Sequence, residues 1–184
     1  MKLLFFDTET TGLPKFCAPA TAFPNNYPDI VSIAWCVCTH DQTVLSKEYY
    51  LVIPEWDIPQ GSIDVHGITE QMATHGRTLK YVVEAFLRAF NEADVIVGHN
   101  VEFDVNVLHN ALKWRLHMPQ RLKKRQFCTM VFSRIEGKKQ FTLEELYMSL
   151  FGTLPEGTHN AEHDTQITQA CFFKAWGHLL AKNG

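Results

Sequence analysis

The chain has 184 residues, of which 46% are hydrophobic, and a formal net charge of -3 at pH 7. This composition indicates one soluble domain, 1–184, and the charge gives no global case for nucleic-acid binding. No segment approaches the roughly 20 apolar residues that span a bilayer, and the apolar residues 3–6 end at Asp7, too early for a signal peptide. We therefore expect a cytoplasmic protein without a membrane partner.

The first part of the chain predicts three strands. Residues 2–6 form a short buried strand, followed by a turn-like segment that begins at Asp7. Residues 14–28 contain four prolines and predict an irregular surface loop. Residues 30–37 are almost continuously apolar, which is typical of a strand covered on both faces, and residues 43–53 would complete a hairpin with them.

The second part predicts helices around one further strand, 94–98. Thr78 would cap an amphipathic helix, and another helix would begin after Asn100. Thr142 and Glu145 have the spacing of a capping box. The last helix, 161–181, would bury one stripe: Ile167, Cys171, Phe172, Ala175 and Leu179. The pattern as a whole predicts a single α/β domain.

The cysteines are odd in number and contain no CxxC pair. Cys36 and Cys38 would share one face of a strand, where they lie too close in sequence to bridge easily. We expect free thiols, and neither disulfides nor zinc, for all five: Cys17, Cys36, Cys38, Cys128 and Cys171.

Asp7 and Glu9 are the first candidate site residues. Side chains two apart on a strand project to the same side, so these two carboxylates would lie together at the end of the first strand. Adjacent carboxylates repel and are costly to desolvate, and a bound divalent cation removes that conflict. The pair alone is a weak signal.

Asp104 lies in the segment 98–104, which follows the fourth predicted strand and starts a helix. Asn100 is a plausible N-cap, and an acidic residue in the first turn is favoured by the helix dipole. Capping and packing would also explain Asp104 and Phe103 without any function.

The third candidate segment is 159–164, between a loop with glycine and proline and the final helix. Asp164 would fall in the first turn of this helix, and His159 in the loop before it, free to approach a substrate. A histidine titrates near neutral pH, which suits a base that takes a proton from water. His163 would point elsewhere, and we expect no role for it.

Together these segments resemble the DnaQ-like exonucleases, in the histidine-containing branch of the DEDD superfamily. The resemblance covers nearly the whole chain, because four matching strings occur in the family's order: 6–13, 66–69, 98–104 and 159–164. It implies an RNase H-like fold, a mixed β-sheet flanked by α-helices.

The resemblance also implies a role for each site residue. Asp7, Glu9, Asp104 and Asp164 would hold two Mg²⁺ or Mn²⁺ ions, and His159 would be the general base. The reaction would release nucleoside 5′-monophosphates from a 3′ end. Further residues would hold or surround the terminal nucleotide: Thr10, Thr11, Leu13, Asn100 and Phe103. His66 is similar to a family histidine behind the site, although loop packing explains it equally well.

The expected substrate is the 3′ end of a nucleic acid, with DNA favoured over RNA. A 3′ exoribonuclease with the same site and a non-catalytic nucleic-acid-binding module are the alternatives; the presence of all five catalytic residues disfavours the module. The chain ends soon after the last helix, so a repair or turnover enzyme is at least as plausible as a proofreader that joins a polymerase. The basic stretch 113–125 could contact phosphates or be a solvated loop.

Overall fold

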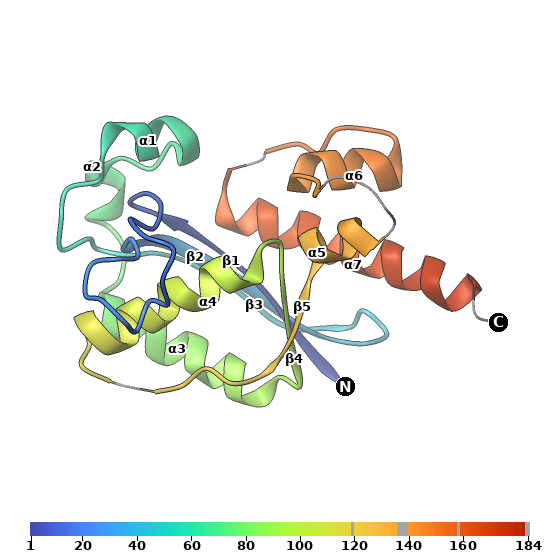
Figure 1. The fold of residues 1–184 in the computed structure, drawn as a ribbon, viewed down its shortest axis with the longest axis horizontal. Coiled ribbons are helices and arrows are strands. Elements are labelled where there is room, and N and C mark those ends of the chain that lie inside the picture. Colours follow the sequence, from blue (N-terminus) through green and yellow to red (C-terminus); the bar gives the residue numbers. More distant parts are fainter. Residues whose placement is uncertain (119, 136–139, 158, 183–184) are drawn as a thin grey trace.

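A computed structural model describes residues 1–118, 120–135, 140–157 and 159–182, although not the side chains of 134–135 and 176–182 (Figure 1). In this part of the chain, five strands form one sheet in the order β3-β2-β1-β4-β5. The strands are β1 (Lys2–Thr10), β2 (Ile30–Thr39), β3 (Val44–Leu51), β4 (Val95–Gly98) and β5 (Arg125–Cys128). β1 pairs antiparallel with β2 and parallel with β4, so the sheet is mixed, as predicted.

Helices cover both faces of this sheet (Figure 1). α3 (Leu79–Glu92) and α4 (Val101–Asn110) pack on one face, and α7 (Ala161–Lys182) packs on the other. The remaining helical segments are α1 (Gln60–His66), α2 (Glu70–Ala73), the π-helix η1 (Ala111–Arg115), α5 (Thr129–Ile135) and α6 (Leu143–Phe151). The predicted arrangement of a mixed sheet between helices is confirmed.

The alternation of β1 decides which helix each of its side chains meets. Leu4 and Phe6 belong to the large cluster that includes the buried faces of α3 and α4. Leu3 and Phe5 instead join Phe172 of α7. Because side chains two apart share a face, this alternation directs Asp7 and Glu9 towards α7.

The predicted end of the first strand is wrong. Pairing with β2 continues through Asp7, opposite Ala34, and Glu9, opposite Ser32, so β1 runs to Thr10. Charged side chains do not end a central strand when its backbone hydrogen bonds continue and the carboxylates project from one face. The pairing shifts between Glu9 and Thr10, and such bulges are common beside active sites.

Most of the other predicted elements are confirmed. Thr78 caps α3, and Thr142 with Glu145 forms the capping box of α6. Asn100 does precede α4, but it makes no side-chain capping bond because its φ of 66° departs from the extended backbone of a capping residue. The predicted burial of Leu179 lies outside the described side chains.

All five cysteines are free thiols, and Cys36, Cys38 and Cys171 are buried. In the part of the chain that the structure describes, no helix has an apolar stretch long enough to cross a membrane.

Candidate active site

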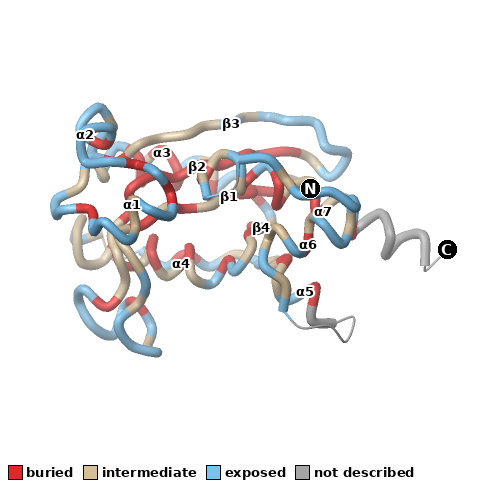
Figure 2. Tube along the Cα trace, turned by 90° about the horizontal axis from the view of Figure 1, so that it is seen from above, coloured by how far each residue is buried: buried red, intermediate tan, exposed pale blue. Residues whose placement is uncertain are grey.

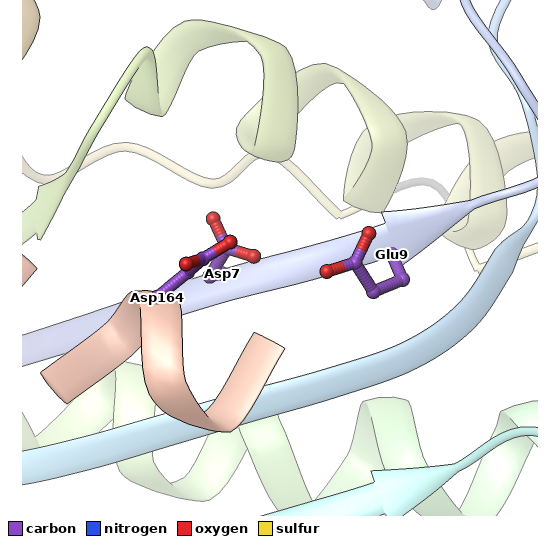
Figure 3. Close-up of side chains that lie close together, drawn as sticks. All are labelled: Asp7, Glu9 and Asp164. Carbon is purple, nitrogen blue, oxygen red and sulfur yellow. The ribbon is translucent and has the colours of Figure 1, made fainter. Parts of the chain in front are cut away.

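Three carboxylates from two elements meet beside β1 (Figure 3). Asp7 and Glu9 project from β1, and Asp164 comes from the first turn of α7. One oxygen from each of the three lies within 4.8 Å of the others. The alternation of β1 and the packing of α7 on that face thus bring together residues more than 150 positions apart in the chain.

The electrostatics of this cluster favour protonation or a bound cation. Burial, together with the charges of Asp104, Asp164 and Glu9, raises the pKa of Asp7 well above its ordinary value. Burial and the charges of Asp164 and Asp104 raise the pKa of Glu9 to about 7. Burial also raises the pKa of Asp164 to about 6. Near neutral pH the cluster therefore gains from any positive charge placed among its oxygens.

The donor set fits a divalent metal ion. Carboxylate oxygens are the ligands that hard cations such as Mg²⁺ and Mn²⁺ prefer. The buried Oδ1 of Asp164 has no hydrogen-bond partner among the described residues, so it is available as a ligand.

Asp104 lies close to the cluster but is held differently. Its side chain is 3% exposed, and its Oδ1 accepts hydrogen bonds from the Thr8 amide at 3.1 Å and the Thr8 hydroxyl at 2.6 Å. Burial raises the pKa of Asp104 to about 7 although the Thr8 bonds oppose that change. Thr8 is absent from the predicted site residues, because a threonine between two acids stands out only once α4 is known to pack on that face of β1.

His159 lies at the edge of this site. It is exposed, has a φ of 62° and lies two residues before Ala161, the first residue of α7. Its charge and its backbone amide both lower the pKa of Asp164, which places it next to the cluster. His163 is exposed, its Nδ1 lies 2.8 Å from the carbonyl oxygen of Gly157, and its charge also lowers the pKa of Asp164, as the third of the effects that oppose burial.

The predicted nucleotide-contact residues surround the end of β1. Leu13 is 80% exposed and lines a hollow of about 490 Å³ together with Asn100 and Phe103. Thr10 is buried and its hydroxyl donates to the Gly12 carbonyl, while the Thr11 hydroxyl accepts from the Asp29 amide. The two threonines thus shape the turn after β1, and Leu13 is the most exposed of the three.

Two further histidines hold the site's surroundings together. His66 is buried at the end of α1, and its Nδ1 accepts a hydrogen bond from the Ile68 amide at 3.0 Å. His99 bridges the Thr129 hydroxyl and the Phe141 carbonyl, and burial lowers its pKa to about 4. Both side chains thus hydrogen-bond to backbone groups of neighbouring segments.

The basic stretch is largely engaged within the molecule. Lys113 donates to the Thr21 carbonyl and Lys124 to the Asn91 carbonyl, while Arg115 forms an ion pair with Asp29. Three members of the stretch are exposed: Arg121, Lys123 and Arg125. The stretch is thus not a uniform phosphate-binding surface.

The chain is similar to known exonucleases and DNA polymerase III subunits. The sequence profile of the family described as Exonuclease matches residues 4–172. A DNA polymerase III subunit epsilon-like protein of Rhodobacter capsulatus is 33% identical over 98% of this chain, which spans 25% of that protein. The DNA polymerase III subunit epsilon of Treponema pallidum is 28% identical over 97% of this chain and 78% of its own length.

Solved structures share the fold. Exonuclease X in complex with 5′ overhanging duplex DNA has a TM-score of 0.69 and 25% identity, covering 96% of this chain and 92% of that one. E. coli Exonuclease I in complex with a dA16 oligonucleotide has a TM-score of 0.76 at 21% identity, with 95% and 40% covered. The chain therefore belongs to the DnaQ-like exonuclease family of the DEDD superfamily and has its RNase H-like fold.

Proposed function

We propose that this protein is a metal-dependent 3′→5′ exonuclease that acts on DNA and releases nucleoside 5′-monophosphates. The observation that carries the proposal is the convergence of Asp7, Glu9 and Asp164, whose oxygens lie within 4.8 Å of one another and whose pKa values are all raised. A structural role does not explain two carboxylates near the end of a central strand that repel each other and a third one from α7.

Four carboxylates would hold the two divalent ions. Asp7, Glu9 and Asp164 offer oxygens directly, and Asp104 adds a fourth carboxylate whose orientation Thr8 fixes. When bound, such ions activate an attacking water and stabilise the charge that develops on the leaving 3′ oxygen. Without them, the raised pKa values mean that Glu9 and Asp104 bind protons as the pH falls through about 7, and Asp164 as it falls through about 6.

His159 would take the proton from the attacking water. Its exposed position leaves the imidazole free to meet a substrate, and its proximity to Asp164 keeps it beside the carboxylates. A positioned histidine base contributes about 10²–10⁴-fold to the rate of such reactions.

The 3′-terminal nucleotide would lie in the hollow of about 490 Å³ beside Leu13 and Phe103. Support for DNA as the substrate comes from the Exonuclease X structure, which contains duplex DNA. RNA stays the alternative, because two-metal hydrolysis does not require a 2′-hydroxyl and discrimination depends on the shape of the pocket. A polymerase or repair complex is the expected partner.

The test is a time course on a DNA oligonucleotide labelled at its 5′ end, with Mg²⁺ or with a chelator. We expect a ladder shortened stepwise from the 3′ end in Mg²⁺ only, and Asp7→Asn should abolish it while the circular dichroism spectrum stays unchanged. The exposed Asp64, whose carboxylate contacts Gln60 within α1, gives the matched control Asp64→Asn, which should retain full activity.

Three results would contradict the proposal: hydrolysis in the chelator, products shortened from the 5′ end, or activity of Asp7→Asn above a tenth of the wild-type rate. An RNA oligonucleotide of the same sequence decides the substrate class. Faster hydrolysis of RNA would replace DNA with RNA in the proposal.

A further inference from the structure

The loop 14–28 is firmly attached to the body of the protein. It contains neither helix nor strand. Three consecutive residues of η1 nevertheless contact the loop or the residue that follows it. Lys113 donates at 2.6 Å and Trp114 at 2.9 Å to loop carbonyls, and Arg115 contacts a carboxylate at 2.7 Å. Their partners are Thr21, Ala20 and Asp29 respectively. The loop runs beside α4 and η1 (Figure 1, dark blue).

Asn26 fixes the loop from within. This side chain is 1% exposed, accepts a hydrogen bond from the Phe16 amide, and donates to the carbonyls of Phe16 and Ala18. A long loop with a buried, hydrogen-bonded side chain at its centre keeps one conformation. Such ordered loops often have a binding function.

The loop 14–28 borders a hollow of about 320 Å³, which we call the Trp56 pocket. Its floor and rim include Thr11, Leu13, Lys15, Tyr27, Trp56 and Arg115. Thr11 and Leu13 follow Glu9 of the carboxylate cluster by two and four residues. The pocket also shares Leu13 and Tyr27 with the hollow of about 490 Å³ that contains Phe103, so the two hollows adjoin at these residues.

The chemistry of the Trp56 pocket suits a nucleotide. Trp56 is 61% exposed, so much of its indole is open to a ligand, and the Arg115 guanidinium lies 5.9 Å from the centre of the ring. Two N–H groups of Arg115 are used by Asp29, whereas Lys15 is exposed and has no ion pair in the described part of the chain. An exposed aromatic ring next to positive charge is the usual platform for an unpaired base and its phosphate.

The size of the pocket limits what it can hold. A hollow of about 320 Å³ is near the lower end of the range for small-ligand sites, ~300–1,000 Å³. It fits one nucleotide and is too small for a duplex.

We propose that the Trp56 pocket is a second nucleotide-binding site, which stacks one unpaired base of the nucleic-acid substrate on Trp56 and holds its phosphate near Lys15. The proposal rests on the proposed nuclease function and deepens it, because it assigns the loop 14–28 and Trp56 to substrate binding. The nucleotide would come from the hydrolysed strand or from the opposite strand of a duplex end.

The test measures binding in the Asp7→Asn background, where the probes stay intact. The probes are a labelled single-stranded DNA oligonucleotide, the same strand in a duplex with a 5′ overhang, and dAMP. Trp56→Ala should weaken at least one DNA probe by about 5-fold or more. Loss with both DNA probes identifies the hydrolysed strand, and loss with the duplex alone identifies the opposite strand. Loss with dAMP alone would overturn the proposal, because the pocket would then bind a free product and not the substrate.

Tyr81 provides the matched control, because it is also an exposed aromatic residue with an arginine, Arg77, 5.8 Å from its ring, but it lies on α3 outside the pocket. Tyr81→Ala should leave all affinities unchanged. Unchanged affinities for Trp56→Ala, or an equal loss in both variants, would overturn the proposal.

A kinetic measurement separates this outcome from failure of the proposed function. Trp56→Ala with an intact Asp7 should raise KM and keep kcat, because the pocket lies apart from the carboxylates. If the wild type hydrolyses DNA and Trp56→Ala has the same KM, the pocket proposal fails alone. If the wild type hydrolyses nothing, the nuclease proposal fails and the binding data still decide the pocket.

Discussion

At the scale of single residues, the site depends on which face of β1 each side chain occupies. Asp7 and Glu9 could be paired from the sequence because their spacing of two residues fits a strand. Their link to Asp164 followed only from a resemblance, since no local pattern places the start of α7 beside β1. Thr8, which orients Asp104, went unnoticed because a threonine between two acids carries no signal until the partner helix is known.

The two histidines near the start of α7 should differ sharply. His159→Ala should lower kcat by about 10²–10⁴-fold, because the water would lose its base. His163→Ala is the control four residues away and should stay within about threefold of wild type, because this side chain contacts the Gly157 carbonyl and its replacement leaves the base in place. Initial rates on the labelled oligonucleotide provide the comparison. Equal effects of the two substitutions would rule out His159 as the base.

Trp56 illustrates what a single sequence does not reveal. It stands in a segment with Pro54, Glu55 and Asp57, where no apolar periodicity exists to judge it by. Its significance depends on the distant residues that border the same pocket, namely Leu13, Lys15 and Arg115. Tertiary proximity supplies that information, and local sequence does not.

At the scale of elements, the helices with strong caps were predicted well and the functional junctions less well. The Thr142 capping box and the apolar stripe after Thr78 are local patterns, so the sequence alone locates α6 and α3. The end of β1 depends on its pairing with β2, and the conformation of Asn100 depends on the junction between β4 and α4. Both of these lie beside the carboxylates.

The anchored loop leads to a prediction about Asn26. Asn26→Ala removes a buried side chain with three hydrogen bonds to Phe16 and Ala18, and should lower the free energy of unfolding by about 1–3 kcal/mol. It should also expose residues 14–28 to limited proteolysis. Urea unfolding measures the first effect, with the exposed Asn91→Ala as control, which should change stability by no more than about 0.5 kcal/mol. A loss as small as that of the control would show that Asn26 does not hold the loop.

At the scale of the whole molecule, the sheet order brings the chain's beginning, middle and end to one place. β1 lies between β2 and β4, so α4, which follows β4, and α7, which packs across β1, both reach the same strand (Figure 2). The α/β class and the mixed sheet could be predicted from periodicity and the family resemblance. The distances within the carboxylate cluster could not, because they depend on the packing of α7 against the sheet.

This assembly makes folding stability depend on pH and on metal ions. The pKa values of Glu9 and Asp104 are raised to about 7, and that of Asp164 to about 6. Raised carboxyl pKa values in the folded state mean that the folded protein binds more protons than the unfolded chain. The stability of the metal-free protein should therefore be greatest below about pH 4 for these groups and should fall as the pH rises through 6 to 7.

The sharpest check that the carboxylates hold a cation is the thermal unfolding midpoint at pH 8, with and without Mg²⁺, for the wild type and Asp7→Asn. Mg²⁺ at about 100 times its Kd should raise the wild-type midpoint by roughly 5–10 °C. Asp7→Asn should start higher than the metal-free wild type, because one repelling charge is gone, and should gain little from Mg²⁺. An equal gain in both proteins, or none in the wild type, would mean that Asp7, Glu9 and Asp164 do not form a metal site.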